Sequence, residues 1–483
     1  MSKTQVFFIG AGPGDPELIT QKACRILAEC DVVLYDYLVH PNITLMASQA
    51  KKVCVGKKKG AHSTQQTDIN QMMIDYVKQG NMVVRLKGGD PMIFGRCGEE
   101  MAALNSHGMH YEIVPGITSA ISVPTNIGIP ITHRDHSHSV AFVTATRAND
   151  MANTMLPNAD TLIIMMSLLR LSEIVERLKT DRNGSTPIAI VQSGTYASQR
   201  ILIGTLDTIV AKQGDAQLQP PALMIVGDVV NLQQTFNWRD HLPLNQHRFV
   251  LFRSTHQQSD LARTLMQLGA EALSLPLNKI KLVEQPDLIE LLTNSNHILF
   301  TSENGVHGLM RQLLASGSDA RTFAGKIVCA IGSHTAAICK SYGIIPDTIP
   351  KQSTTPGVIN HYETILTEND SLLIPTTAIA GNDLLELSKT NATIKKVNVY
   401  ENDLPDDTEP FFQWLNPADH LIFMNSASVE RCNNIYPNFI QHQAISIGPK
   451  TTATLQKLGV KHIIEADSPS KDHLVTTILN NFR

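Results

Sequence analysis

The segment VFFIGAGPGDPELIT, residues 6–20, decides the fold of the first part of this chain. Its first four residues, 6–9, are apolar and are typical of a buried strand. Three alternating glycines follow at positions 10–14, and glycine permits backbone angles and close ligand contacts that other residues hinder. Pro16 suits the first turn of a helix. A strand that passes through such a turn into a helix usually opens a ligand crevice in an α/β sheet.

The first alternative for this loop is a nicotinamide dinucleotide site. Its fingerprint is G-x-G-x-x-G, whereas Gly10, Gly12 and Gly14 are separated by single residues and Asp15 follows at once. A carboxylate beside a pyrophosphate would be repelled, and Pro13 removes one amide donor. The second alternative, a purely structural turn, needs fewer glycines. The loop therefore favours a different ligand.

A second segment, MVVRLKGGDPMIFGRCG at residues 82–98, repeats the pattern. Residues 82–86 predict a strand, and the pair Gly88 and Gly89 follows it, with Asp90 directly after. Ligands of α/β proteins bind at the carboxyl ends of strands. We therefore expect both glycine loops to contribute to one site.

Together these loops resemble those of the uroporphyrinogen-III C-methyltransferases, which use S-adenosylmethionine. Further matching segments follow in order: VVLYDYLV (32–39), VGKKKGAHSTQQTDIN (55–70), VPGITSA (114–120), GIPITHR (128–134), SGTYASQR (193–200) and PALMIVGDVV (221–230). Several motifs in the correct order are stronger evidence than any one of them. The resemblance covers about residues 4–232 and implies an α/β unit of two subdomains, of the tetrapyrrole-methylase type.

The composition of the 483 residues predicts a soluble enzyme of about two to four domains. The net charge is −4, so the charge indicates neither a nucleic-acid nor a membrane partner. No apolar run approaches the roughly 20 residues that span a bilayer, and the start MSKTQVFFIG lacks the features of a secretory signal. We expect a cytoplasmic protein.

Cysteines and histidines show no metal-binding pattern. The seven cysteines contain no C-x-x-C pair, which favours buried thiols in a reducing compartment. His133, His136 and His138 cluster but lack a second group of ligands. We therefore expect no metal site.

The chain divides near the polar segment NWRDHLPLNQH, residues 237–247. This division predicts two domains, residues 1–242 and residues 248–483. After it the alternation of strands and helices restarts, so the second domain is also α/β with parallel sheets.

The second domain contains an internal repeat, which predicts two lobes. ILFTSENGV (298–306) parallels LIFMNSASV (421–429), and AIGSHTAAICKSYGI (330–344) parallels SIGPKTTATLQKLGV (446–460). Ser302, Thr335, Ser426 and Thr451 follow the predicted strands of these units. These residues either cap the next helix or face a cleft in which helix N-termini bind substrate carboxylates.

This domain resembles uroporphyrinogen-III synthase. FTSENGV, AIGSHTA, IGPKTT and Tyr400 within KKVNVYENDLP carry the resemblance. Two departures concern substrate binding: Ser254 follows Arg253 where the family often has R-P, and residues 381–383, GND, lack an arginine. The resemblance implies a two-lobed synthase fold and a role for Tyr400 in assisting departure of the substrate hydroxyl. A structural tyrosine is the alternative.

The resemblance to the methyltransferases implies roles for individual residues of the first domain. Asp36 matches the proton acceptor and Lys57 matches the proton donor, while a helix cap and a solvated lysine are the respective alternatives. Contacts to S-adenosylmethionine, or to its product S-adenosylhomocysteine, carry over to Pro13, Gly88, Gly89, Asp90, Ile93, Thr118, Ser119, Met166 and Gly194.

A tetrapyrrole with eight carboxylates also requires cationic side chains. We expect these to be Arg85, Lys87, Arg96, His133 and Arg134, since arginine binds carboxylates through two parallel hydrogen bonds. Departures from the family pattern lie at Cys97, at residues 143–147 and at Asn126 with Ile127.

The expected function is bifunctional. The second domain cyclises hydroxymethylbilane to uroporphyrinogen III with inversion of ring D. The first then adds two methyl groups, at C2 and C7, to give precorrin-2 for sirohaem or cobalamin, and forms a homodimer as the resembled enzymes do. No dehydrogenase or ferrochelatase segment precedes Met1, so later steps are expected on other proteins. The alternative is a methyltransferase whose second domain is a non-catalytic tetrapyrrole-binding module.

Overall fold

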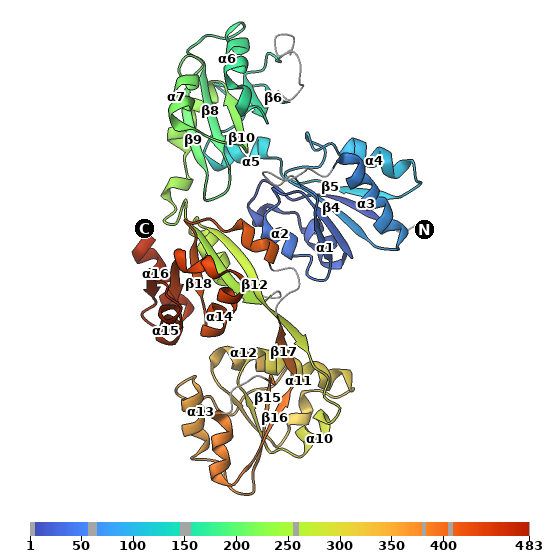
Figure 1. The fold of residues 1–483 in the computed structure, drawn as a ribbon, viewed down its shortest axis with the longest axis vertical. Helices are drawn as coiled ribbons and strands as arrows, with labels where there is room; N and C mark the ends of the chain where they lie inside the picture. The colour runs from blue at the N-terminus through green and yellow to red at the C-terminus, as the bar shows by residue number, and fades with distance from the viewer. Residues whose placement is uncertain are drawn as a thin grey trace. The chain divides into compact units, whose positions relative to one another are not determined.

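The computed structural model describes residues 5–56, 65–144, 156–254, 260–378, 383–403 and 409–482. The chain forms two compact units: Met1–Leu275 together with Asp407–Arg483, and Pro276–Asp406. Figure 1 shows the helices and strands of both units. The first unit therefore contains the predicted first domain together with part of the predicted second domain.

The first sheet is parallel and has the strand order β3-β2-β4-β1-β5. Val6 pairs with Val83 and Gly10 pairs with Lys87, so the predicted strands before the two glycine loops are neighbours. Both loops consequently leave the same edge of the sheet, as the sequence predicts. The elements are β1 (Val6–Gly10), α1 (Gln21–Glu29), β2 (Val32–Tyr35), α2 (Pro41–Leu45), β3 (Lys51–Cys54), α3 (Gln66–Lys78), β4 (Val83–Lys87), α4 (Cys97–Asn105) and β5 (Tyr111–Val114).

Helix α5 (Ser119–Asn126) leads into a second sheet, with the order β6-β7-β10-β8-β9. Strands β6 and β7 are parallel and the other pairs are antiparallel. Alternate residues of β7 enter different cores: Ile164 packs with α6, whereas Ile163 packs with α5, as the two-residue period of a strand requires. The elements are β6 (Val140–Thr144), β7 (Thr161–Met165), α6 (Leu171–Lys179), β8 (Pro187–Gln192), β9 (Arg200–Thr205), α7 (Ile209–Ala216) and β10 (Ala222–Val226).

The predicted linker, residues 237–247, is packed on both of its sides. Trp238 Nε1 donates to Thr125 O (3.1 Å), and Arg239 Nη2 donates to Gly269 O (3.2 Å). Leu244 is fully buried in the core of the sheet that follows. This packing explains why the first unit continues beyond residue 242.

A third sheet has the order β17-β12-β11-β18-β19-β20, and β11, β18, β19 and β20 are parallel. Its strands are β11 (Arg248–Ser254), β12 (Glu271–Leu282), β17 (Tyr400–Asp403), β18 (His420–Phe423), β19 (Gln443–Ser446) and β20 (Ile463–Glu465). Its helices are α9 (Asp260–Gln267), α14 (Ser426–Ile435), α15 (Pro449–Lys457) and α16 (Lys471–Phe482).

The second unit contains a four-stranded parallel sheet with the order β14-β13-β15-β16. Its elements are α10 (Leu288–Thr293), β13 (His297–Phe300), α11 (Glu303–Ala315), β14 (Ile327–Ala330), α12 (Ser333–Ser341), α13 (Thr355–Tyr362), β15 (Ser371–Thr376) and β16 (Thr393–Asn398). The segment from β13 to α12 corresponds to the segment from β18 to α15. The predicted repeat is therefore two copies of a strand–helix–strand–helix arrangement.

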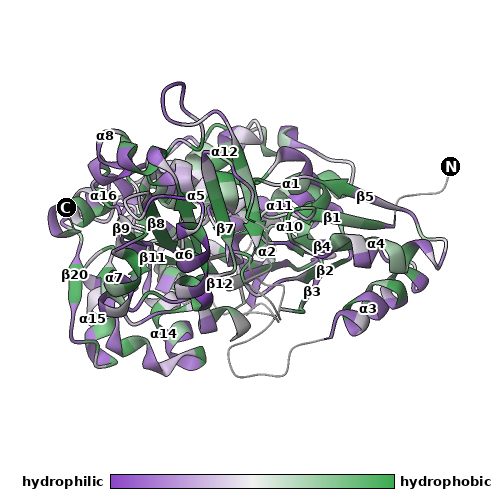
Figure 2. Cartoon of the chain, turned by 90° about the horizontal axis from the view of Figure 1, so that it is seen from above, coloured by the Kyte–Doolittle hydropathy of each residue, from purple (hydrophilic) through white to green (hydrophobic). Residues whose placement is uncertain are grey.

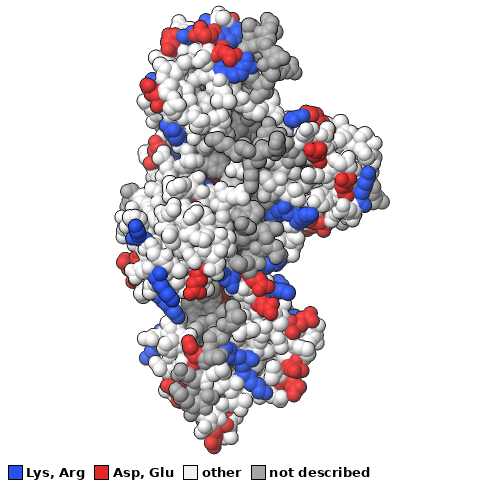
Figure 3. Space-filling view, in the orientation of Figure 1, with Lys and Arg blue, Asp and Glu red and all other residues white. Residues whose placement is uncertain are grey.

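Strands such as β1 and β7 are largely hydrophobic, whereas helix α3 carries hydrophilic residues (Figure 2). Acidic and basic side chains are intermixed on the face of the molecule in Figure 3. Among the described residues, no helix combines the length and the apolar character needed to span a membrane. Within those same ranges, no group of three or more His, Cys, Asp or Glu residues could hold a metal ion.

Candidate active site of the first domain

Two glycine loops are hydrogen-bonded to each other at the carboxyl end of the first sheet. Gly89 N donates to Gly12 O over 2.7 Å, and Gly12 N donates to Gly89 O over 3.2 Å. Both residues have positive φ angles, +76° at Gly12 and +67° at Gly89. Other residues adopt this conformation only with strain, so the paired loops require glycine.

A third loop, between β5 and α5, packs directly on these two. A Cβ atom on Gly10 would lie 2.5 Å from Gly116 Cα, and one on Gly116 would lie 2.4 Å from Gly89 O. Asp90 fixes this contact, since its Oδ2 accepts from Gly116 N (3.0 Å) and its Oδ1 accepts from Met92 N (2.8 Å). Each Asp90 oxygen retains a lone pair with which it could bind a ligand.

A fourth loop, between β8 and β9, reaches the first one from the second sheet. Thr195 Oγ1 donates to Pro13 O over 3.3 Å. A Cβ atom on Gly14 would lie 2.5 Å from the ring of Tyr196. The fold thus brings the predicted Pro13 loop against the predicted Gly194 loop.

The other predicted cofactor residues occupy the same four loops or their flanks. Thr118 and Ser119 start helix α5 beside the second glycine loop. Gly194 packs closely against α5, because a Cβ atom on Gly194 would lie 2.5 Å from the side chain of Val123 in that helix. Ile93 is half-buried in the turn after β4, and Met166 is exposed directly after β7.

Backbone strain is concentrated in these segments. Of the eight non-glycine residues that have positive φ angles in the described part of the chain, five lie here. These are Phe94, Arg96, Met166, Ser193 and Thr195. Such conformations cost on the order of 1–3 kcal/mol each and cluster at ligand-binding sites.

The surface of these loops fits the S-adenosylmethionine that the resemblance implies. A Cβ atom on Gly88 would meet nothing within 4 Å, so the backbone there faces open space. Large apolar side chains are exposed in the neighbouring segments, namely Leu38, Met92, Phe94, Ile117, Ile121 and Met166. Small-molecule sites combine such apolar surface with a few polar backbone groups.

A network of buried charges ends at Asp36. Arg85 Nη2 donates to Asp36 Oδ1 over 2.6 Å, and Arg85 Nε donates to Glu100 Oε1 over 2.9 Å. Lys87 Nζ lies 3.2 Å from Glu100 Oε2. Burial alone would lower the pKa of Arg85, but the charges of Asp36 and Glu100 raise it above its ordinary value. Asp36, with 33% of its side chain exposed, is the member of the network that reaches the surface.

This arrangement corrects the prediction that Arg85 and Lys87 contact substrate carboxylates. Arg85 is only 2% exposed and Lys87 only 4%, and internal carboxylates already pair with both. Their side chains point into the protein because Glu100 lies there. Both side chains pair with Glu100, and Arg85 also pairs with Asp36.

The other three predicted cations lie nearer the surface. Arg96 is exposed, and its two hydrogen bonds to Glu99, 2.8 and 2.7 Å long, raise its pKa. His133 Nδ1 accepts from Asp135 N over 3.2 Å. Arg134 is exposed, and within the described ranges no side chain pairs with it.

Two further expectations concern residues after β3 and β4. Lys57, the predicted proton donor, lies outside the described residues. Cys97, which replaces the glycine typical of the family, is buried in the core between α3 and α4. Burial, together with the charge of Glu100, raises the pKa of its thiol to about 11, so the thiol stays uncharged.

In the second unit, the fold brings Ser302 and Tyr400 together. Their hydroxyl oxygens are 3.2 Å apart, although the residues lie 98 positions apart in the sequence. Ser302 also caps α11, since its Oγ accepts from Gly305 N over 3.1 Å. Tyr400 is 7% exposed, and burial raises the pKa of its phenol.

The other repeat residues behave differently from Ser302. Asn425, not Ser426, caps α14, and Ser426 Oγ instead donates to Lys450 O over 3.2 Å. Thr335 and Thr451 are buried in the first turns of α12 and α15, which have glycine N-caps. The capping alternative thus applies to Ser302 alone, and the lining of a cleft by these four residues and Tyr400 stays a prediction.

Sequence reasoning missed Glu100, the central anion of the Asp36 network. Cys97, Glu100 and Leu104 form the buried face of α4. Their spacing of three and four residues is that of one helix face. Because Glu100 is a carboxylate on the otherwise apolar face of this helix, the sequence could have predicted a buried ion pair at this position.

Two family models match the chain. The model for Tetrapyrrole (Corrin/Porphyrin) Methylases matches residues 5–210, and the model for Uroporphyrinogen-III synthase HemD matches residues 259–476. Both resemblances that the sequence motifs indicated are confirmed.

Individual relatives agree with these models. The porphyrin biosynthesis protein HemD of Ruminiclostridium josui is 30% identical over 98% of this chain and 97% of its own length. The uroporphyrinogen-III C-methyltransferase of Methanocaldococcus jannaschii is 44% identical over 47% of this chain and 97% of its own length. A crystal structure of uroporphyrin-III C-methyltransferase from Thermus thermophilus with S-adenosyl homocysteine has 36% identity and a TM-score of 0.40, covering 47% of this chain and 99% of that one.

The extent of these matches decides the family. The chain spans about half the length of the siroheme synthases that it also matches. Its similarity to the Ruminiclostridium josui protein, in contrast, extends over nearly the full length of both chains. The chain therefore belongs to the porphyrin-biosynthesis family in which an S-adenosylmethionine-dependent tetrapyrrole methylase is fused to a HemD-type uroporphyrinogen-III synthase.

Proposed function

We propose that residues 1–242 methylate uroporphyrinogen III twice, at C2 and C7, to give precorrin-2. Residues 248–483 supply that substrate by cyclising hydroxymethylbilane with inversion of ring D. The observation that carries the first assignment is the convergence of four loops beside the Asp36 network: three leave the carboxyl end of the first sheet, and one comes from the second sheet. The family models and the names of the relatives support both assignments.

S-adenosylmethionine supplies an electrophilic methyl group, which needs little activation. The protein must therefore hold a pyrrole carbon in line with that methyl group, so that the C–C bond forms as the S–C bond breaks, and must accept a proton that the cationic methylated tetrapyrrole then loses at another position. Asp36 is suited to accept the proton, because its carboxylate is partly exposed and its orientation is fixed by Arg85. Lys57 remains our candidate for the proton donor.

The cofactor is proposed to lie on the four loops. Backbone groups at Gly88 and Gly89 face open space or the start of α5, and Asp90 offers its remaining lone pairs to the amino group or the sulfonium. The other proposed contacts are Pro13, Ile93, Thr118, Ser119, Met166 and Gly194. The exposed apolar side chains beside them suit an adenine ring.

The tetrapyrrole carries many carboxylates, so exposed cations are needed to bind it. Arg96, His133 and Arg134 are the proposed partners, because none of the three is buried in an internal ion pair. Arg85 and Lys87 contribute indirectly, through the carboxylates that they hold.

In the synthase domain, Tyr400 is proposed to assist departure of the terminal hydroxyl as water. Because burial raises its pKa, the phenol stays protonated and can donate a hydrogen bond. The Ser302 hydroxyl, 3.2 Å from the Tyr400 phenol oxygen, orients the phenol. Helix N-termini near Thr335, Ser426 and Thr451 are proposed to bind substrate carboxylates.

We also propose a homodimer formed through the methylase domain, in the cytoplasm. The exposed Leu169 and the edge strand β9 with exposed Ile201 offer surface for a partner copy. The seven cysteines are all free thiols, which is typical of a reducing compartment.

One coupled assay tests both activities. Full-length protein is supplied with hydroxymethylbilane and S-adenosylmethionine, and the products are separated by isomer and by methyl count. We expect isomer III and its dimethylated product. Hydroxymethylbilane closes spontaneously to isomer I, so recovery of isomer I alone would favour the non-catalytic binding module for the second domain. Absence of methylation when uroporphyrinogen III is supplied directly would overturn the first assignment.

A further inference from the structure

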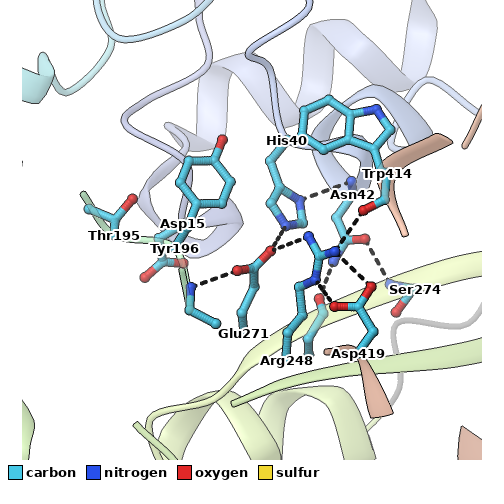
Figure 4. A network of polar contacts seen from close by, with 12 residues as sticks. Asp15, His40, Asn42, Thr195, Tyr196, Arg248, Glu271, Ser274, Trp414 and Asp419 are labelled. Carbon is cyan, nitrogen blue, oxygen red and sulfur yellow. Dashed lines mark hydrogen bonds and ion pairs between the residues drawn. The ribbon is translucent and has the colours of Figure 1, made fainter. Parts of the chain in front are cut away.

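A buried carboxylate of the synthase domain contacts two segments of the methylase domain (Figure 4). Glu271 begins strand β12, and its side chain is 8% exposed. Its Oε2 accepts a hydrogen bond from Ala197 N over 2.7 Å. Its Oε1 lies 3.6 Å from His40 Nε2 and 3.4 Å from Arg248 Nη1.

The Ala197 contact holds the fourth loop of the proposed cofactor site. Two residues earlier, Thr195 donates to Pro13 O on the first glycine loop. Between them, Tyr196 donates from its phenol to Leu38 O over 3.1 Å. A shift of Ala197 would therefore be transmitted to the first glycine loop through Thr195 and to the segment after Asp36 through Tyr196.

The His40 contact holds the segment that follows Asp36. His40 caps α2, since its Nδ1 accepts from Asn42 N over 3.2 Å. Asn42 in turn exchanges two hydrogen bonds with β12: its Nδ2 donates to Ala272 O (2.8 Å) and its Oδ1 accepts from Ser274 N (2.9 Å). The segment that carries the proposed proton acceptor is thus fixed to the synthase domain.

One arginine pairs with both carboxylates of this cluster. Arg248 donates to both oxygens of Asp419, over 2.7 Å in each case, and also faces Glu271. Although burial opposes ionisation of Glu271, the adjacent His40 imidazole and the charge of Arg248 lower the pKa of its carboxyl group. The carboxylate therefore stays charged and binds the Ala197 amide strongly.

We propose that Glu271 is a positioning residue for methyl transfer, which holds the 193–199 loop and the segment after Asp36 in the geometry that cofactor binding requires. The proposal rests on the methyltransferase function proposed above. It implies that the methylase site is complete only when the first part of the synthase domain is packed against it.

The test compares three variants of the full-length chain. Glu271→Ala removes the contacts to Ala197 and His40 in the methylase domain, whereas Glu271→Gln keeps an oxygen that can accept from Ala197 N. Asp419→Asn is the matched control, because Asp419 is also buried and contacts Arg248, but it touches neither methylase segment. Each variant is measured for thermal stability, S-adenosylhomocysteine affinity by calorimetry, hydrogen exchange of residues 193–199, and both activities.

Glu271→Ala should lower kcat/KM for methylation by up to about 10²-fold, the loss that a misplacement of about 1 Å typically causes. It should also weaken S-adenosylhomocysteine binding and speed hydrogen exchange in the loop, while cyclisation continues. Glu271→Gln should be intermediate. Asp419→Asn should lose stability but keep the wild-type affinity for S-adenosylhomocysteine.

Two results would overturn the proposal. One is wild-type affinity for S-adenosylhomocysteine in folded Glu271→Ala, and the other is an equal loss of affinity in Asp419→Asn. A wild-type protein that binds S-adenosylhomocysteine but methylates no tetrapyrrole would contradict the proposed function instead. The affinity difference between the variants would then still decide the role of Glu271.

Discussion

Arg85 on β4 donates a 2.6 Å hydrogen bond to Asp36, which directly follows the neighbouring strand β2. The strand register explains the contact: Arg85 pairs with Leu34, so its side chain reaches two residues along the adjacent strand. The same guanidinium binds Glu100 on α4. Arg85 thus fixes the orientation of Asp36 and is itself fixed by Glu100, which suits the proton acceptor that we propose Asp36 to be.

Asp36→Asn should slow methyl transfer by about 10²–10⁴-fold, the typical contribution of a general acid or base. Asparagine keeps an oxygen that can accept from Arg85, so the fold and cofactor binding should change little. Steady-state methylation and S-adenosylhomocysteine calorimetry on the same preparation check this. Near-normal turnover would leave Asp36 with a structural role only.

Gly89→Val should weaken cofactor binding through its side chain. At φ +67°, a Cβ atom on Gly89 would lie 3.7 Å from the start of α5, within the proposed site. Gly80→Val is a matched control, because Gly80 has a φ angle of +86° and open space around it, in the turn after α3. Both variants should suffer similar strain, on the order of 1–2 kcal/mol.

Calorimetry with S-adenosylhomocysteine separates the two variants, once thermal melts show that both are folded. Only Gly89→Val should lose affinity. Equal affinities in the two variants would mean that the second glycine loop does not contact the cofactor.

The sequence alone was sufficient to predict the glycine loops but not the charge network. Glycines that follow a predicted strand lie at its carboxyl end in any α/β sheet, so β1 and β4 could be expected to share an edge. The side-chain direction of Arg85, in contrast, depends on which face of β4 is covered by α4. Only the packed structure reveals that Glu100 lies beside β4 and pairs with Arg85 and Lys87, so that both side chains are buried.

The repeat in the synthase domain could be predicted more completely than the charge network. The strand–helix pattern could be predicted from the two copies, because each copy has an apolar run followed by polar helix-start residues. The capping position could be transferred too: Ser302 and Asn425 are the fifth residues of the aligned segments 298–306 and 421–429, and they cap α11 and α14. Both side chains accept the amide three residues on, so the copies share the geometry and the position of the cap and differ in residue type. The predicted residue Ser426 lies one position too far along the chain.

Stability should depend on pH through His420. Burial first, and then the charge of His247 nearby, lowers its pKa from 6.5 to about 4. An unfolded chain therefore binds a proton at this site more readily than the folded chain between these pH values. The stabilising contribution is fully present above pH 6.5 and is lost as the pH falls toward about 4, by at most ~3 kcal/mol.

Urea unfolding at several pH values checks this expectation. His420→Gln cannot titrate and should show a shallower loss of stability below pH 6.5 than the wild type. His462→Gln, at an exposed position in the same part of the fold, is the control and should keep the wild-type slope. Identical slopes in all three proteins would show that His420 does not titrate in this range.

The pair of Ser302 and Tyr400 should control the synthase reaction. Tyr400→Phe removes one hydroxyl group, while the ring keeps its packing in the core beside α11. Cyclisation should slow and hydroxymethylbilane binding should persist, because the change removes only the hydroxyl group, with its hydrogen bonds to Ser302 and to the departing hydroxyl. The ratio of isomer III to isomer I is the sensitive measure, since the substrate closes to isomer I without an enzyme.

Ser302→Ala should affect the same ratio, because it removes the partner that orients the Tyr400 phenol. It also removes a helix cap, which typically costs about 1 kcal/mol. Thr354→Ala is the matched control: Thr354 caps α13 through the same contact, to Gly357 N at 3.2 Å, and is not part of the proposed site. Both alanine variants should lose similar stability, but only Ser302→Ala should shift the products toward isomer I. A shift of the same size in Thr354→Ala would assign the effect to lost stability and remove Ser302 from the site.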